Sequence, residues 1–460
     1  MSISMSRTGG GSWRGTVALA LAVASLAGCN MDKFLNLTDP DIINPSDLQS
    51  PAGAEAERIG ALSRLNAATS GTNAGVEATF FLYGGLLGDE YRSGDTFIER
   101  NATDQRDVQT NNANIQQAIG ILHGARVSAF QAHEALKKYA PDAPAWEIAE
   151  MYVAEGFTET MLADNLCNGI PLSYTLEGGV KVLGTPLTDA EVYEKAPAHY
   201  DTALSILGNT TGEMEDTTRW KAMVGRGRTL LDLGRFADAS AAVASVPTDY
   251  LWQMEHAQTT RSNVIWSLNI SGRRYTIPES EGPMGLNWQT AKDPRVPVCM
   301  GGTAGCPTTN PAVFDPGATF PLWVQKLWPT PDAPVTISSG VEARLIQAEA
   351  LLQAGNASWL DTLNMLRARV SGLAPLADPG TAAARVDLLF RERAFWLFST
   401  GHRLPDMRRL LRAPYDRTEA QVFPTGPFIK GGNYGSDVNF PVTQAEENNQ
   451  NFHGCIDRNP

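Results

Sequence analysis

The sequence has 460 residues with a formal net charge of −13, and 43% of its residues are hydrophobic. This length is ample for a buried core, and the mean hydropathy of −0.21 fits a globular body. An acidic chain lacks the positive surface that nucleic acids require, and anionic lipids repel it. The composition therefore excludes nucleic acids and anionic membranes as partners that are bound by charge alone.

The first 28 residues have the pattern of an export signal. Arg7 and Arg14 supply positive charge, and an apolar run covers residues 16–26. This run is too short for a transmembrane helix, which needs about 20 residues. Positive charge followed by a short apolar run is typical of a signal peptide, so we expect 1–28 to be removed.

The signal ends in Leu26-Ala27-Gly28-Cys29, which resembles the bacterial lipobox. In a lipobox the cysteine thiol is acylated, by chains such as palmitate, and the cysteine becomes the first residue of the mature protein. We therefore expect a lipid anchor on Cys29 and an extended tether over 29–50. The alternative is an ordinary signal with a chance cysteine, but the spacing of charge, apolar run and small residues favours lipidation.

Helical periodicity dominates residues 51–247. In the segment 112–141, apolar residues recur at intervals of three and four, which predicts an amphipathic helix. Its expected buried face consists of Ile115, Ala118, Ile119, Leu122, Ala125 and Ala129. A second helix is predicted over 144–165, antiparallel to the first, with Pro141 and Pro144 at the break.

A capping box begins the next helix, because Thr188 is followed by Glu191 three residues later. Pro197 is expected to kink or split this helix. The segment 219–247 then reads as two short helices joined at Gly234. Its order of Trp, Leu-Gly, Phe, Ala and Pro resembles a tetratricopeptide unit.

The helical period is lost over 248–337, where glycine and proline are dense and tryptophan recurs. Such a long irregular segment inside a compact protein is usually functional. Helices resume at Ser339, which is predicted to form a second capping box with Glu342, and they continue to residue 412. The last residues, 413–460, are again irregular.

These elements predict an all-α fold of tetratricopeptide-like helix hairpins in a single domain over 51–460. The hairpins occupy two blocks, 51–247 and 338–412. An irregular insert over 248–337 separates the blocks, and an irregular tail over 413–460 follows them.

Four cysteines remain after Cys29, and an even number in an exported protein suggests disulfide bonds. Cys299 and Cys306 close a short glycine-rich loop and are predicted to pair. Cys167 would then pair with Cys455. A metal site is the alternative, but the sequence has no C-x-x-C and its six histidines lie singly, so we expect no metal and no cofactor.

Several stretches together resemble the SusD/RagB family of nutrient-uptake lipoproteins. They are "RLIQAE" at 344–349, "LNMLRARVSGL" at 363–373, "RERAFWLFSTGHRLPDMRRL" at 391–410, "ADNLCNGIPLS" at 163–173, "DPR" at 293–295, "GLLGDEYRSGD" at 85–95 and "FPVTQAEENNQN" at 440–451. Thr400 stands where the family usually has glutamate. The stretches occur in the family's order and span nearly the whole mature chain.

The resemblance implies a non-catalytic lipoprotein on the surface of the bacterial outer membrane. Such a protein binds oligosaccharide, or alternatively peptide, and acts as the lid of a SusC-like TonB-dependent channel. The implied fold is α-rich, with tetratricopeptide-like hairpins as the scaffold. We expect the hairpins to face the channel and the loops of 248–337 to line the enclosed space.

Charged residues cluster in the last helical segment, at Glu392, Arg393, Arg403 and Asp406. Arginine stays protonated and is a poor general acid or base. We interpret the cluster as structural ion pairs that lock the last helices, with substrate contact as the alternative.

Candidate ligand contacts are Trp266 and Trp288, in polar stretches of the insert, and Asn73, Asp89 and Arg92 near the N-terminus. A tryptophan ring can stack on the apolar face of a sugar, but it can equally fill the core. The charged residues can equally belong to a solvated loop. We find no nucleophile motif and no phosphate loop, and we predict no catalytic residues.

Two other functions fit parts of the pattern. An exported helical-repeat scaffold for envelope assembly would share the hairpins, but it has no reason to carry the insert. A secreted glycoside hydrolase would need two acidic groups at a defined separation, which a sequence does not reveal.

Overall fold

The computed structural model describes residues 48–71, 79–442 and 448–460. The export signal, Cys29, most of the predicted tether and Asn73 lie outside these residues. The chain divides into one unit over 1–50 and another over 51–460, and the second unit is described below. Among the described helices, none is both long enough and apolar enough to cross a membrane.

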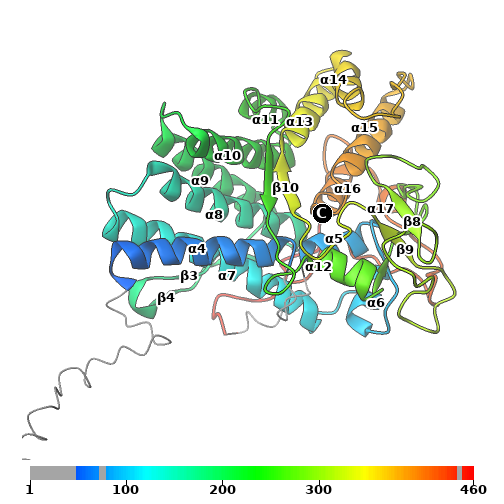
Figure 1. Ribbon diagram of the computed structural model, residues 1–460, viewed down its shortest axis with the longest axis horizontal. Coiled ribbons are helices and arrows are strands. Elements are labelled where there is room, and N and C mark those ends of the chain that lie inside the picture. Colours follow the sequence, from blue (N-terminus) through cyan, green and yellow to red (C-terminus); the bar gives the residue numbers. More distant parts are fainter. Residues whose placement is uncertain (1–47, 72–78, 443–447) are drawn as a thin grey trace, which may run out of the picture. The chain divides into compact units, whose positions relative to one another are not determined.

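The first helical block is a stack of long antiparallel helices. They are α4 (Pro51–Thr69), α7 (Ala113–Tyr139), α8 (Ala145–Asn165), α9 (Asp189–Leu207) and α10 (Glu213–Asp232). Figure 1 shows these helices lying one above another. The predicted apolar face of α7 is confirmed, because all six of its residues are buried. The small alanines on this face allow α7 to pack closely against α4 and α8.

The helix ends follow local chemistry. Thr188 and Glu191 form the predicted capping box at the start of α9. Pro197 lies inside α9 and does not split it. Gly234 adopts a φ of 71° in the turn between α10 and α11 (Phe236–Ala242), a conformation that glycine adopts without strain.

The two ends of the insert lie side by side. Strand β6 (Leu251–Met254) pairs with β10 (Val335–Ser339) in antiparallel register. The helical stack therefore continues from α10 and α11 directly to α13 (Gly340–Gln353) and α14 (Ser358–Arg367). The Ser339 hydroxyl accepts from the backbone N–H of Glu342 at 3.1 Å, but the Glu342 carboxylate pairs with Arg228 instead. Only half of the second predicted capping box is present.

Within the insert, regular structure is short. It comprises α12 (Val264–Trp266), the π-helical turn η2 (Ser267–Ser271), β7 (Tyr275–Thr276), β8 (Val298–Met300) and β9 (Trp323–Gln325). Strands β8 and β9 pair with each other, and β7 pairs with β1 (Arg92–Ser93) from outside the insert. A small apolar cluster lies within this region, separate from the main core, and consists of Ile270, Val313, Leu322 and Val324.

The remaining elements complete the unit. They are α5 (Phe80–Leu87), α6 (Ile98–Asp104), β2 (Ile170–Pro171), β3 (Tyr174–Thr175), the 3-10 turn η1 (Glu177–Gly179), β4 (Lys181–Val182), β5 (Pro186–Leu187), α15 (Ala382–Trp396), α16 (Arg403–Leu411) and α17 (Glu419–Val422). The fold is helix-rich with only short strands, as predicted.

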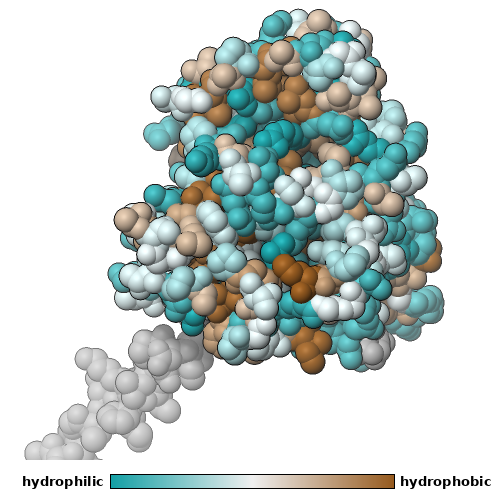
Figure 2. Space-filling view, turned by 90° about the vertical axis from the view of Figure 1, so that its right-hand side faces the viewer, coloured by the Kyte–Doolittle hydropathy of each residue, from teal (hydrophilic) through white to brown (hydrophobic). Residues whose placement is uncertain are grey.

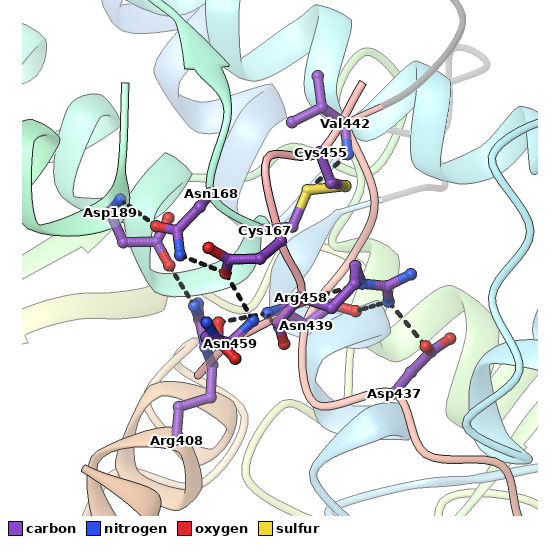
Figure 3. Close-up of a disulfide and its surroundings, with 11 residues drawn as sticks. Cys167, Asn168, Asp189, Arg408, Asp437, Asn439, Val442, Cys455, Arg458 and Asn459 are labelled. Atoms are coloured by element: carbon purple, nitrogen blue, oxygen red, sulfur yellow. Dashed lines mark hydrogen bonds and ion pairs between the residues drawn. A yellow bond between two sulfur atoms is a disulfide. The ribbon is translucent and has the colours of Figure 1, made fainter. Parts of the chain in front are cut away.

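Both predicted disulfides are present, and one of them joins the tail to the first helical block. Cys167 is bonded to Cys455 across 288 residues, and Cys299 is bonded to Cys306. Figure 3 shows the Cys167–Cys455 bond among the hydrogen bonds that hold the tail. Beside it, the backbone N–H of Cys167 donates to the Phe440 carbonyl at 2.8 Å.

The predicted structural ion pairs lie inside the protein. Arg393 donates two hydrogen bonds of 2.8 Å to Asp406 and so joins α15 to α16. Glu392 accepts from Arg295 of the insert at 2.6 Å. Arg403 donates to the Gly88 carbonyl, at the end of α5, at 3.0 Å. These contacts agree with a structural role.

Candidate functional site

The segment after α5 meets the insert at one surface. Arg92 of β1 lies opposite Thr276 of β7. The Gly94 N–H donates to the Arg274 carbonyl at 2.9 Å, and the Asp315 N–H donates to the Gly94 carbonyl at 2.9 Å. Segments far apart in the sequence thus form one continuous surface.

Asp95 is the polar centre of this surface. Its buried carboxylate accepts from Arg274 at 2.7 Å and from Arg100. Burial alone would raise the pKa of Asp95, but its hydrogen bonds with Arg100 and Arg274 hold that pKa below its ordinary value. Lys430, from the tail, donates to the Asp95 carbonyl at 2.6 Å and lies 3.1 Å from the Asp315 carboxylate. The loops are therefore fixed relative to one another.

Phenylalanine rings and cations alternate over this centre. The Arg274 guanidinium lies 3.5 Å from the ring centroid of Phe314 and 5.1 Å from that of Phe97. The Arg92 guanidinium lies 5.2 Å from the ring centroid of Phe320. We call these five residues the aromatic face.

Parts of the aromatic face are open to solvent, since Phe97 is 48% exposed and Phe314 is 37% exposed. Ile98, which follows Phe97 in the chain, is also exposed, and so is Ile429, which precedes Lys430. In Figure 2, which views the side of the molecule that carries β8 and β9 in Figure 1, small apolar patches lie among mostly hydrophilic residues. Flat rings beside fixed cations suit a ligand that has both an apolar face and hydrogen-bonding groups.

Two of the predicted ligand residues lie at this surface. Arg92 belongs to the aromatic face, although its guanidinium is also paired with Glu281. Trp266, at the end of α12, is partly exposed and packs with Phe320 against the small apolar cluster of the insert.

The structure contradicts two other predicted ligand contacts. Trp288 is fully buried, packs on Phe395 with ring centroids 4.9 Å apart, and donates from Nε1 to the Asp89 carbonyl at 3.0 Å. Asp89 is also buried, and burial followed by repulsion from Glu281 raises the pKa of its carboxyl group. Both side chains therefore lie in the interior and are not exposed to a ligand.

Sequence reasoning missed Phe97, Phe314, Phe320 and Lys430. Each lies singly in an irregular segment, so no periodicity marks it. Only the pairing of β1 with β7, and the return of the tail, bring these residues together.

A buried group of acids lies close to the aromatic face. Asp89, Asp104 and Glu281 are all buried, and burial raises the pKa of each carboxyl group. Repulsion from the Glu281 carboxylate raises the pKa values of Asp89 and Asp104 further. Glu281 is also paired with Arg92 of the aromatic face.

Two cavities lie elsewhere in the unit. One of about 410 Å³, between β10 and the end of α15, is lined in part by Trp328, Phe395 and Trp396. Another of about 880 Å³ is lined in part by Trp359 and Tyr415. The indole N–H of Trp396 is buried and has no hydrogen-bond partner within the described part of the chain, which makes the smaller cavity the second candidate for ligand binding.

No family model and no curated protein matches this sequence. Solved structures do match. Surface glycan-binding protein A from Bacteroides uniformis has a TM-score of 0.66 at 15% identity, over 88% of this chain and 99% of its own. A SusD superfamily protein from Bacteroides fragilis has a TM-score of 0.64 at 15% identity, over 88% and 99%. A SusD-like carbohydrate binding protein from Bacteroides vulgatus has a TM-score of 0.61 at 11% identity, over 88% and 97%.

The chain thus has the fold of SusD superfamily proteins over nearly all of its length. The resemblance in its sequence motifs is confirmed at the level of the fold.

Proposed function

We propose that this chain, which has the SusD fold, is a non-catalytic carbohydrate-binding protein whose ligand contacts the aromatic face. The observation that carries the proposal is the stack of Phe97, Arg274 and Phe314, because exposed rings and fixed cations match the two kinds of surface on a sugar. Several neighbours of the same fold are named as glycan- or carbohydrate-binding proteins. Peptide is the alternative ligand.

Calorimetry against a panel of oligosaccharides and peptides tests this proposal. We expect at least one oligosaccharide to bind, and the double change Phe97→Ala with Phe314→Ala to weaken that binding roughly tenfold, since each ring contact contributes about 0.5–1.5 kcal/mol. Ile59→Ala is the matched control, because Ile59 is a 56% exposed apolar residue in α4, outside the aromatic face. Unchanged binding in the double variant would move the site to another surface, such as the 410 Å³ cavity.

The same samples test catalysis. We expect the oligosaccharides to remain intact after prolonged incubation with the protein. Product formation that rises with protein concentration would replace the binding proposal with the glycoside hydrolase alternative. A protein that binds nothing on the panel would leave the envelope scaffold as the better explanation.

We further propose that lipid on Cys29 tethers the protein to the outer membrane, at the cell surface. Replacing Cys29 by Ala removes the thiol that is acylated, so the variant should be recovered as a soluble or unprocessed product. A single acyl chain binds membranes only marginally, whereas several hold a protein firmly. Membrane fractionation of the Cys29→Ala variant beside the wild type measures this, and a variant that still fractionates with the outer membrane would exclude tethering through Cys29.

The partner in this proposal is a SusC-like TonB-dependent channel, and this protein acts as its lid. The helical hairpins would face the channel, and the loops of 248–337 would line the enclosed space. A ligand trapped between two surfaces gains contacts from both, and this difference in affinity would favour the closed state. Affinity purification from detergent-solubilised membranes should recover a barrel partner. Recovery of none, together with unaffected transport after deletion of the gene, would leave a free-standing surface binder.

A further inference from the structure

Two histidines that are far apart in the sequence meet two glutamates between helices α7, α8 and α9. His133 of α7 places Nε2 3.1 Å from Oε2 of Glu155 in α8. His199 of α9 places Nδ1 3.6 Å from the same oxygen and Nε2 3.3 Å from Oε2 of Glu159. We call these four residues the histidine–glutamate cluster. These two histidines lie singly in the sequence, and the fold brings them together.

Glu159 is the least satisfied member of the histidine–glutamate cluster. Its side chain is 1% exposed, and neither carboxylate oxygen has a hydrogen-bond partner among the residues that the structure describes. Its nearest charged neighbours are His199 at 3.3 Å and Arg126 at 3.5 Å. A buried carboxylate without hydrogen bonds is costly, so a group that bonded these oxygens would stabilise the site.

The donor set suits a transition metal ion. Glu155 and Glu159 are four residues apart and therefore project from one face of α8. One donor atom each from Glu155, Glu159 and His199 lie within 4.8 Å of one another. Imidazole and carboxylate donors favour zinc and similar ions, whereas calcium and magnesium favour sites made of oxygen alone.

The surroundings would orient the ligands and admit an ion. The Tyr152 ring stacks on His133, with centroids 4.1 Å apart and planes 13° apart, which fixes the imidazole. The His199 side chain is 21% exposed, so the histidine–glutamate cluster opens to solvent at that residue. Arg126 adds positive charge beside Glu159 and would weaken cation binding without blocking the other donors.

We propose that Glu155, Glu159 and His199, with His133 as an additional ligand, bind one divalent transition metal ion of the zinc class. The ion would take the place of the long ion-pair contacts and bond the unsatisfied oxygens of Glu159. It would cross-link α7, α8 and α9. This proposal does not depend on the aromatic face or on carbohydrate binding.

Zinc titration of the purified, untagged, full-length chain in detergent, after treatment with a chelator, tests the proposal. We expect one zinc ion per chain by competition with a chromophoric chelator, and a higher melting temperature when zinc is present. Glu159→Gln and His199→Gln should each weaken binding more than about tenfold and abolish the rise in melting temperature. Calcium and magnesium at the same concentration should not bind.

His453→Gln is the matched control, because His453 is exposed and lies outside the histidine–glutamate cluster, and it should bind zinc like the wild type. His199 is the more exposed of the two ligands tested, so His199→Gln decides the outcome if Glu159→Gln does not fold. No zinc binding by the wild type, undiminished binding by a folded His199→Gln variant, or equal binding of calcium would overturn the proposal. In a protein that binds no zinc, these residues would form ion pairs only.

Discussion

Arg228 of α10 and Glu342 of α13 form a buried ion pair that joins the helices before the insert to the helices after it. The guanidinium donates from Nε to Oε1 at 2.6 Å and from Nη2 to Oε2 at 2.8 Å. Arg228 also donates to the Ile337 carbonyl at 3.0 Å, at the end of the insert. One arginine therefore holds both helical blocks and the ribbon that closes the insert.

Breaking this pair from one side should destabilise the protein strongly. Arg228→Met leaves the buried Glu342 carboxylate with His402 as its one ion-pair partner among the described residues, so we expect the free energy of unfolding to fall by about 3–5 kcal/mol. The double change Arg228→Met with Glu342→Leu removes both charges. It should lower the free energy of unfolding by less than the sum of the two single changes. Urea denaturation measures all three variants. Strictly additive losses would show that the two residues do not act as a pair.

Close packing around Tyr200 predicts a second effect. Gly225 of α10 lies so near the Tyr200 ring that an added Cβ would stand 2.5 Å from it. Gly225→Ala should therefore lower the free energy of unfolding by about 1–3 kcal/mol, although alanine favours helices. Gly120→Ala in α7 is the control, because its added Cβ meets nothing within 4 Å. That variant should gain about 0.5–1 kcal/mol, and a loss of similar size in both would exclude packing as the cause.

The buried carboxyl group of Glu90 predicts a pH dependence. Burial raises the pKa of Glu90 from 4.5 to about 8, although the Ser399 N–H donates to its carboxylate at 2.9 Å. The folded protein therefore holds a proton on Glu90 over a pH range where the unfolded chain has released it. The contribution of Glu90 to stability is full below pH 4.5 and is lost as the pH rises to about 8.

Glu90→Gln isolates this contribution, because glutamine keeps an oxygen for the Ser399 N–H and does not titrate. The wild type should lose stability relative to this variant between pH 5 and pH 9, by on the order of a few kcal/mol. Denaturation curves of both proteins at several pH values provide the difference. Parallel pH profiles would mean that Glu90 is ionised in the folded state.

The disulfides should differ in their contribution to stability. Cys167–Cys455 closes a loop across 288 residues, whereas Cys299–Cys306 spans only 7. Replacing the first pair with alanines should lower the free energy of unfolding by about 2–5 kcal/mol, because the unfolded chain regains much conformational freedom. The same change in the Cys299–Cys306 pair is the control and should lower the free energy of unfolding by less. Thermal unfolding of both variants measures the order, and the reverse order would contradict this account.

Local sequence determined much of the scaffold. The period of three and four residues over α7 selects its buried face, because residues at that spacing share one side of a helix. Thr188 and Glu191 determine where α9 begins, since their side chains bond the first backbone amides of that helix. The ordered motifs of the C-terminal half predicted the SusD fold, which the solved structures confirm.

Only the tertiary structure decided which polar and aromatic residues meet. Trp288 and Trp266 both lie in polar stretches of sequence, yet one is fully buried against Phe395 and the other is partly exposed. Phe97 and Phe314 meet through Arg274 because β1 pairs with β7, and His133 meets His199 because α7 and α9 pack on α8. Helix periods and caps depend on neighbours within a few residues, which a sequence displays directly. Contacts between distant segments depend on how whole elements pack, so they are fixed only when the chain is folded.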